Sequence, residues 1–105
     1  MKVYFSKNLL IQMNHLGYTR SGYEILRDIA ANDLVEEPFE SCIYPYGIEG
    51  TTKADMNVAC FKNNIEGMIY LMTVLESEMY EQIEDTIEWV SYTEMKKYWR
   101  ENNIQ

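Results

Sequence analysis

Carboxylate side chains are concentrated in one third of the chain, between residues 63 and 95. This window contains eight of the 17 acidic residues and none of the nine Lys and Arg residues, so the whole net charge of -8 arises there. Like charges three or four residues apart destabilise a helix, and anions are disfavoured near its C-terminal end. Stability alone therefore does not explain the arrangement, and we predict a surface that binds a cationic partner through Glu78, Glu81, Glu84, Asp85 and Glu88.

Two more ordinary explanations of the acidic surface stay open at this point. Lys96, Lys97 and Arg100 follow the acids closely, so a last helix that folds back would neutralise part of their charge. The carboxylates would otherwise be a solvated face. Either explanation is compatible with a binding role.

Glu76 has the least ordinary predicted environment of these acids. In a helix across residues 64–88 it projects into the apolar side, whereas most of the other acids lie opposite. A carboxylate in that position must pair with a base, have a raised pKa or reach solvent at the edge of the core. We expect Glu76 to reach the edge, with a paired structural role and an acid/base role as the alternatives.

Tyrosines alternate with Pro and Gly in a second candidate region, residues 41–52. Tyr44 and Tyr46 lie on either side of Pro45, and residues 45–47 have the composition of a turn. We include both tyrosines among the protein-binding residues, although we expect their rings to cover one end of the core. Together with Glu76 they would serve the alternative hypothesis of a small-molecule-binding or catalytic domain.

No motif in the sequence identifies an enzyme. His15 is the one histidine, no Ser or Cys lies in a nucleophile motif, and no glycine-rich phosphate loop is present. Cys42 and Cys60 are too few for a zinc cluster or a disulfide framework, and we expect buried thiols in a reducing cytoplasm. We therefore predict a non-enzymatic cytoplasmic protein with no catalytic residue, cofactor or metal.

The overall charge and hydropathy restrict the class of partner. A pI near 4.5 opposes contact with the phosphates of nucleic acid and with anionic membranes. Two short predicted helices joined at residues 17–20 have the form of a helix-turn-helix, but this acidity favours a plain helical hairpin. No apolar run approaches the roughly 18 residues that span a bilayer. We predict a protein partner with a basic surface, and no direct contact with nucleic acid or membrane.

Hydrophobic periodicity and capping residues predict a single α+β domain over residues 1–105. Its expected order is β-α-α-β-β-α-β-α, with about four short strands and helices packed on the sheet. The predicted strands cover residues 2–5, 40–44, 55–61 and 86–91, and the predicted helices cover residues 7–16, 22–31, 64–88 and 92–102. The first residues of the strand at 86–91 are equally suited to the end of the long helix.

The predicted helix over residues 64–88 is the longest element and has a continuous apolar side. At 100° per residue, one arc of it collects eight apolar side chains that we expect to face the core: Ile65, Met68, Ile69, Met72, Leu75, Met79, Tyr80 and Ile83. Asn63 and Asn64 are suitable N-caps for it.

These features favour a small protein that works by binding another protein. Its acidic helix would meet a basic groove, with charge raising the association rate and aromatic residues supplying affinity. One version is an inhibitor that mimics nucleic acid, as small acidic anti-defence proteins of phages and mobile elements do as a class. Besides the small-molecule alternative, a structural homo-oligomer such as a homodimer is a third hypothesis.

Overall fold

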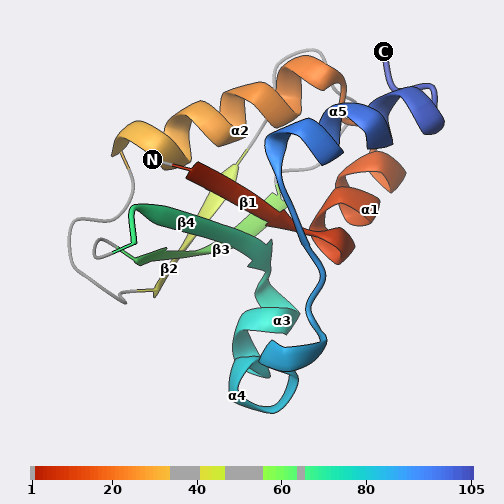
Figure 1. Cartoon of the computed structure of the whole chain (residues 1–105). Coiled ribbons are helices and arrows are strands. Elements are labelled where there is room, and N and C mark those ends of the chain that lie inside the picture. The colour runs from red at the N-terminus through yellow and green to blue at the C-terminus, as the bar shows by residue number, and fades with distance from the viewer. Residues whose placement is uncertain (1, 34–40, 47–55, 64–65) are drawn as a thin grey trace.

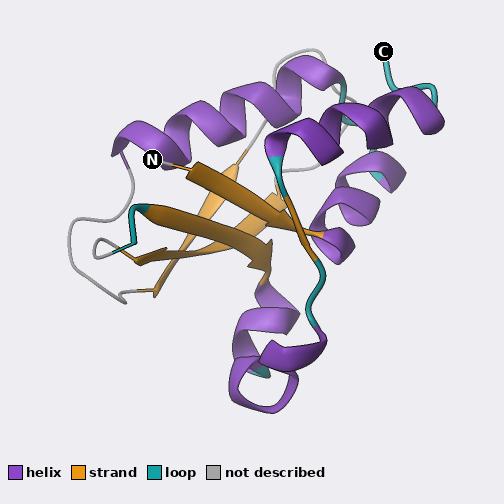
Figure 2. Cartoon of the chain, viewed as in Figure 1, coloured by secondary structure: helices purple, strands orange, loops and turns teal. Residues whose placement is uncertain are grey.

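The computed structural model describes residues 2–33, 41–46, 56–63 and 66–105. Its centre is a mixed five-stranded sheet with the strand order β2-β3-β4-β1-β5, and helices lie on both sides of the sheet (Figures 1 and 2). In chain order the elements are β1 Lys2–Ser6, α1 Lys7–His15, α2 Arg20–Asp33, β2 Ser41–Tyr46, β3 Met56–Asn63, β4 Met68–Thr73, α3 Val74–Glu78, α4 Tyr80–Ile83, the 3-10 helix η1 Glu84–Thr86, β5 Trp89–Val90 and α5 Tyr92–Glu101. The predicted α+β class is confirmed.

The middle of the sheet is the parallel pair of β1 and β4, in which Val3 lies opposite Ile69. The other three pairs are antiparallel: β2 with β3, β3 with β4, and β1 with β5. Because β1 and β4 run in the same direction, their carboxyl ends lie at the same edge of the sheet. Each strand continues directly into a helix there, α1 after Ser6 and α3 after Thr73.

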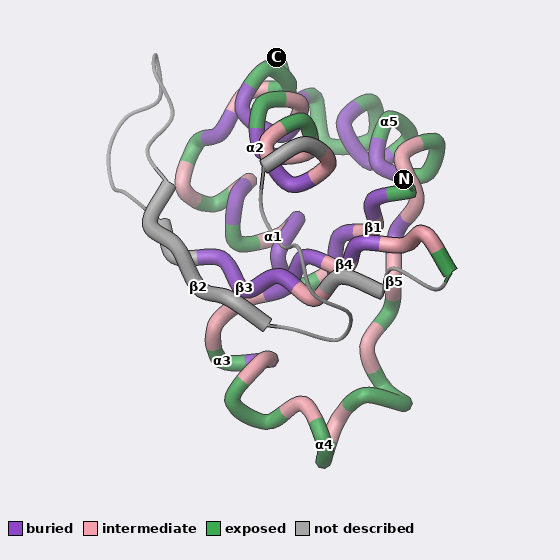
Figure 3. The backbone as a smooth tube through the Cα atoms, turned by 90° about the vertical axis from the view of Figure 1, so that its left-hand side faces the viewer, coloured by how far each residue is buried: buried purple, intermediate pink, exposed green. Residues whose placement is uncertain are grey.

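One face of the sheet builds the main core with α1, α2 and α5, where Figure 3 shows buried positions on both layers. Alternate strand residues point into this core because successive side chains of a strand face opposite sides. The buried members are Val3, Phe5, Val58, Cys60, Ile69, Leu71 and Val90 from the strands and Leu9, Leu10, Met13, Tyr23, Leu26, Ala30, Met95, Tyr98 and Trp99 from the helices. Each large apolar side chain buried here contributes about 1.5–3 kcal/mol.

Side-chain caps fix the ends of the helices as the sequence predicts. The Ser6 hydroxyl accepts a hydrogen bond from the Leu9 amide at 3.1 Å and begins α1, which ends before Gly17 at φ 85°. At α5 the Ser91 hydroxyl and the Glu94 carboxylate each accept a hydrogen bond from the other residue's amide, which is a capping box. The expected helices at 7–16 and 92–102 and strands at 2–5, 40–44 and 55–61 correspond to α1, α5, β1, β2 and β3, with residues 40 and 55 outside the described part of the chain. The strand expected at 86–91 is reduced to β5, Trp89–Val90, because Thr86 belongs to η1.

The predicted helix over residues 64–88 is wrong. Residues 68–73 form β4, residues 74–78, 80–83 and 84–86 form the short segments α3, α4 and η1, and residues 64–65 lie outside the described part of the chain. Gly67, at φ 69°, lies in the turn that joins β3 to β4 and not in a helix. Leu75 and Met79 belong to the expected apolar arc, yet they are 64% and 43% exposed.

Two boundaries also differ from the prediction. The helix expected over residues 22–31 is longer and begins at Arg20, because the Thr19 carbonyl already accepts hydrogen bonds from the amides of Gly22 and Tyr23. The turn expected at residues 45–47 also begins too early, since β2 extends to Tyr46. Pro45 is tolerated in that strand because β2 is at the edge of the sheet.

Candidate functional site

The acidic residues lie on a separate lobe, which we define as residues 74–88. It consists of α3, α4, η1 and the link to β5, and it projects from the sheet on the side opposite α1, α2 and α5 (Figures 1 and 3). The five acids predicted as protein-binding residues are all exposed there: Glu78, Glu81, Glu84, Asp85 and Glu88. They occupy short helical segments and not one row along a long helix.

The chain's own last helix does not neutralise this lobe. α5 packs on the other side of the sheet, where the Lys97 ammonium lies 3.7 Å from the Glu101 carboxylate and Lys96 lies over the Tyr92 ring. Among the described residues, no Lys or Arg makes a salt bridge with an acid of the lobe. The local pairing considered from the sequence is therefore not found for Glu78, Glu81, Glu84 and Asp85, whereas Lys97 shares a hollow with Glu88.

Glu88 differs from the other four acids. It lines a hollow of about 190 Å³ together with Lys7 and Lys97, and with Glu94 and Glu101 from α5. The backbone also holds it there, since the Glu88 carbonyl accepts a hydrogen bond from the Lys7 amide at 2.9 Å. Glu88 thus belongs to a surface of mixed charge.

Apolar side chains are exposed beside the acids. Leu75 and Met79, four residues apart, point outward from the first turns of the lobe. Glu78 lies between them on the same exposed side, whereas Tyr80 is half-buried against the Phe61 ring at a centroid distance of 4.9 Å. Apolar anchors surrounded by charges are typical of protein-binding surfaces.

Glu76 is buried, contrary to our expectation that it reaches solvent, with only 4% of its surface exposed. Its Oε1 atom accepts hydrogen bonds from the Ser6 hydroxyl at 2.6 Å and from the Thr73 amide at 3.0 Å. Its Oε2 atom lies 3.4 Å from the Asn8 side-chain nitrogen. Ser6 and Thr73 are themselves the N-caps of α1 and α3, so Glu76 joins the starts of two helices.

The structure does not gather all the predicted site residues in one place. Tyr44 and Tyr46 lie on β2, and β3 separates this strand from β4 and the lobe that follows it. The side chains of both tyrosines are outside the described part of the structure. Their predicted contact with a partner stays a prediction.

The sequence did not reveal a group of rings on the sheet face opposite the main core. We call this group the aromatic face: Tyr4, Phe61, Tyr70, Tyr80 and Trp89. The Tyr4 and Tyr70 rings stack with centroids 5.6 Å apart, and Trp89 meets Tyr70 edge-on at 4.9 Å. Phe61 is the cross-strand partner of Tyr70 and packs on Tyr80. All five residues are partly exposed.

Carboxylates border the aromatic face. Burial and then the negative charge of Glu66 raise the pKa of the Tyr70 phenol above its ordinary value, and the phenols of Tyr4 and Tyr80 act in the same direction. Burial and the charge of Glu84 likewise raise the pKa of Tyr80. Glu66 therefore lies close enough to Tyr70, and Glu84 to Tyr80, for its charge to act on the phenol, while the exposed Lys2 lies on the same side of β1 as Tyr4.

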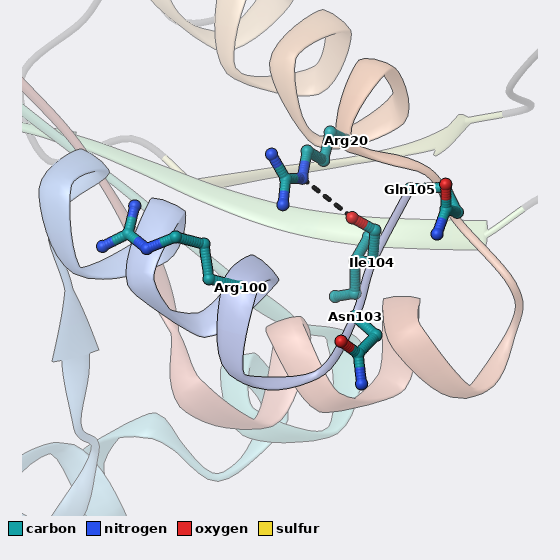
Figure 4. Close-up of a pocket in the computed structure, with 5 residues that line it drawn as sticks. All are labelled: Arg20, Arg100, Asn103, Ile104 and Gln105. Atoms are coloured by element: carbon teal, nitrogen blue, oxygen red, sulfur yellow. Dashed lines mark hydrogen bonds between the residues drawn. The ribbon is translucent and has the colours of Figure 1, made fainter.

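A basic hollow lies at the other end of the molecule. It has a volume of about 420 Å³, and Figure 4 shows Arg20 and Arg100 approaching it from α2 and α5. The Arg20 Nε atom donates a hydrogen bond to the Ile104 carbonyl at 2.8 Å. Arg20 thereby fastens the C-terminal segment to α2.

The chain matches no protein-family model, no curated protein and no solved structure. Within the part of the chain that the structure describes, no helix is long and apolar enough to cross a bilayer. No group of three or more metal-ligating side chains occurs in those residues either. The surface chemistry of the lobe and the aromatic face is therefore the basis for assigning a function to this protein.

Proposed function

We propose that this protein acts by binding another protein, whose basic surface docks on the acidic lobe. One observation carries the proposal: Glu78, Glu81, Glu84 and Asp85 are exposed together, without a salt bridge to any described cation, beside exposed Leu75 and Met79. Charge and apolar surface thus occur side by side on one small projection.

The two kinds of side chain would contribute differently to such a complex. Exposed ion pairs are worth about 0.2–1 kcal/mol each, so the carboxylates mainly raise the association rate and select basic partners. Covering Leu75 and Met79 removes apolar surface from water and supplies affinity at about 25 cal/mol per Å². The apolar pair would form the centre of the interface and the acids its rim.

We propose further that the partner belongs to the proteins that normally bind nucleic acid. A protein that normally binds nucleic acid presents basic side chains spaced for phosphates, and the lobe would occupy them as an inhibitor. Four carboxylates on short helical turns form a compact cluster, so the mimicry concerns a few adjacent phosphates and not a long stretch of duplex. We propose a non-enzymatic, cytoplasmic role for this binding module.

Capture from a lysate of the native host tests the proposal. The bait would be the wild-type protein and a lobe variant with Glu81→Gln and Glu84→Gln. A matched control is Asp28→Asn with Glu101→Gln, which removes the same charge from the opposite side of the sheet. The captured partner is then purified and its affinity for each variant measured at two salt concentrations.

The wild type and the matched control should bind the purified partner equally, and the lobe variant more weakly at low salt. Equal binding of all three would contradict the proposal. Sedimentation of the isolated protein belongs to the same experiment, because a stable homodimer closed through the lobe would support the homo-oligomer hypothesis instead. For the small-molecule alternative, the hydrogen bonds that occupy both Glu76 oxygens provide no support.

A further inference from the structure

Three aromatic rings on the helical side of the sheet, those of Tyr92, Tyr98 and Trp99, have a cation from the same chain over them. The Arg27 guanidinium lies 4.1 Å from the centre of the Tyr92 ring, and Lys96 lies 4.6 Å from the same ring. Lys7 covers Tyr98 at 4.7 Å, and Arg20 is 5.8 Å from Trp99. These contacts are cation–π interactions, in which the negative face of a ring attracts a positive charge.

Within the described part of the chain, the rings of the aromatic face have no such cation over them. Among the described residues, none of the cation–π contacts involves Tyr4, Phe61, Tyr70, Tyr80 or Trp89. The carboxylate of Glu66 raises the pKa of the Tyr70 phenol, and that of Glu84 raises the pKa of the Tyr80 phenol, so both carboxylates lie close to these rings. Partly exposed rings bordered by carboxylates are the chemical environment that a guanidinium prefers. A guanidinium stacks on aromatic rings and donates hydrogen bonds to carboxylates.

We propose that the aromatic face binds an arginine-bearing extended segment of the protein partner, with guanidinium groups stacked on Tyr4, Tyr70 and Trp89. This inference rests on the proposed function and specifies the partner further. The Tyr4 and Tyr70 rings stack on each other at an interplanar angle of 18°, so a guanidinium would meet the outer side of the stacked pair. The acidic lobe rises from the same side of the sheet at the end of β4, so one partner reaches both surfaces.

Charge argues against the two other occupants of such a face. Proteins that stack the bases of single-stranded nucleic acid on aromatic rings place them in a positively charged groove, whereas these rings border carboxylates. A second copy of this chain has few guanidinium groups to offer, because two of its three arginines, Arg20 and Arg27, already lie over its own rings. A partner segment supplied by a different, basic protein fits the face best.

Magnetic resonance of the indole N–H groups tests the proposal without any variant. The chain has two tryptophans, Trp89 in the aromatic face and Trp99 in the main core, where it is 4% exposed. A short peptide of alternating arginine and serine is titrated into the full-length protein. The Trp89 resonance should shift, and the Trp99 resonance should stay in place.

Affinities from fluorescence anisotropy of the labelled peptide supply the second readout. Replacing both stacked rings, with Tyr4→Leu and Tyr70→Leu, should weaken binding on the order of tenfold, since two exposed cation–π contacts are lost. The ring-preserving pair Tyr4→Phe and Tyr70→Phe, and Tyr92→Leu on the helical side, should each change it by less than about twofold. A peptide with lysine in place of arginine should bind more weakly.

An unmoved Trp89 resonance would overturn this inference, and so would equal affinity of the double-leucine variant for the peptide. An oligothymidylate that shifts the Trp89 resonance when the peptide does not would also overturn it. A Trp89 shift caused by raising the protein concentration alone also overturns it, because the occupant is then a second copy. The Tyr4→Leu and Tyr70→Leu variant separates the two proposals, because Glu84 belongs to the lobe and also borders Tyr80. Partner capture that depends on the lobe but not on Tyr4 and Tyr70 leaves the proposed function standing and rejects the aromatic face.

Discussion

The two sides of the sheet satisfy their charged and aromatic groups in different ways. On the helical side Tyr92, Tyr98 and Trp99 are covered by cations of the chain itself, and the Lys97 ammonium meets the Glu101 carboxylate. On the other side, within the described residues, the rings of the aromatic face have no such cation and the acids of the lobe make no salt bridge.

This difference separates residues that stabilise the fold from residues that are available to a partner. A ring or carboxylate already satisfied within the chain gains little from an intermolecular contact, because it must first give up its present one. Glu76 is the exception on the lobe side, since it is buried and fully engaged. The predictions below test which groups belong to which class.

The largest effect on stability should come from Glu76→Ala. The substitution removes the acceptor for the Ser6 hydroxyl and the Thr73 amide and leaves both donors without it in a mostly buried site. Hydrogen bonds to charged groups and unsatisfied buried donors each account for about 1–3 kcal/mol, so the free energy of unfolding in urea should fall by about 2–4 kcal/mol. The exposed neighbour Glu78→Ala is the control and should change it by less than about 0.5 kcal/mol. Equal effects would show that Glu76 is not a structural link.

Alkaline pH should weaken the helical side through Tyr23. Burial raises the pKa of this phenol well above its ordinary value of 10.0, so between these two pKa values the unfolded chain has lost a proton that the folded chain retains. Stability from this group is therefore complete below pH 10 and decreases as the pH rises beyond it, by up to about 1.4 kcal/mol per pH unit. Urea unfolding of the wild type and Tyr23→Phe at a series of alkaline pH values measures the effect. The variant should show a flatter dependence, and parallel curves would contradict the assignment.

Gly67→Ala distinguishes the observed turn from the helix that the sequence suggested. Gly67 has φ 69°, and a Cβ atom built there meets no other atom within 4 Å, so only the backbone conformation opposes alanine. The substitution should lower stability by about 1 kcal/mol. In a helix it would instead raise stability by a similar amount. The sign of the change in urea unfolding decides between them.

The smallest effect on stability should come from the lobe itself. Glu81→Gln with Glu84→Gln removes two exposed acids that have no described salt bridge. The free energy of unfolding should therefore stay within about 0.5 kcal/mol of the wild-type value, and any increase should occur at low salt. Asp28→Asn with Glu101→Gln removes charges that contact Arg27 and Lys97, and it should lower stability slightly. Thermal unfolding at low and high salt compares the two variants. A clear loss of stability in the lobe variant would mean that those acids serve the fold.

Local features of the fold could be predicted because they depend on neighbouring residues. Ser6, Gly17 and Ser91 act at the helix ends where the sequence places them, and β1 follows from the alternation around Val3 and Phe5. The prediction of a helix over residues 64–88 is wrong because Met68, Met72, Leu75 and Met79 recur at helical spacing, although residues 68–73 form a strand. β4 also carries apolar residues on both faces, and such a strand has no clean alternation.

The candidate site could be predicted only in part. The concentration of acids is a property of composition, so Glu78 and its neighbours were found without the fold. The aromatic face depends on strand order, because Tyr4 and Tyr70 meet only through the parallel pairing of β1 with β4. Trp89 joins them only because β5 pairs with the other edge of β1. No local pattern contains that information.

Backbone hydrogen exchange of the complex with the captured basic partner tests the central claim most directly. The account predicts slower exchange in β4 and the acidic lobe, residues 68–88, and unchanged exchange in α2 and α5. Protection confined to α2, α5 and the basic hollow, with residues 68–88 unchanged, would contradict it, because the partner would then bind the side of the sheet whose rings already have their own cations.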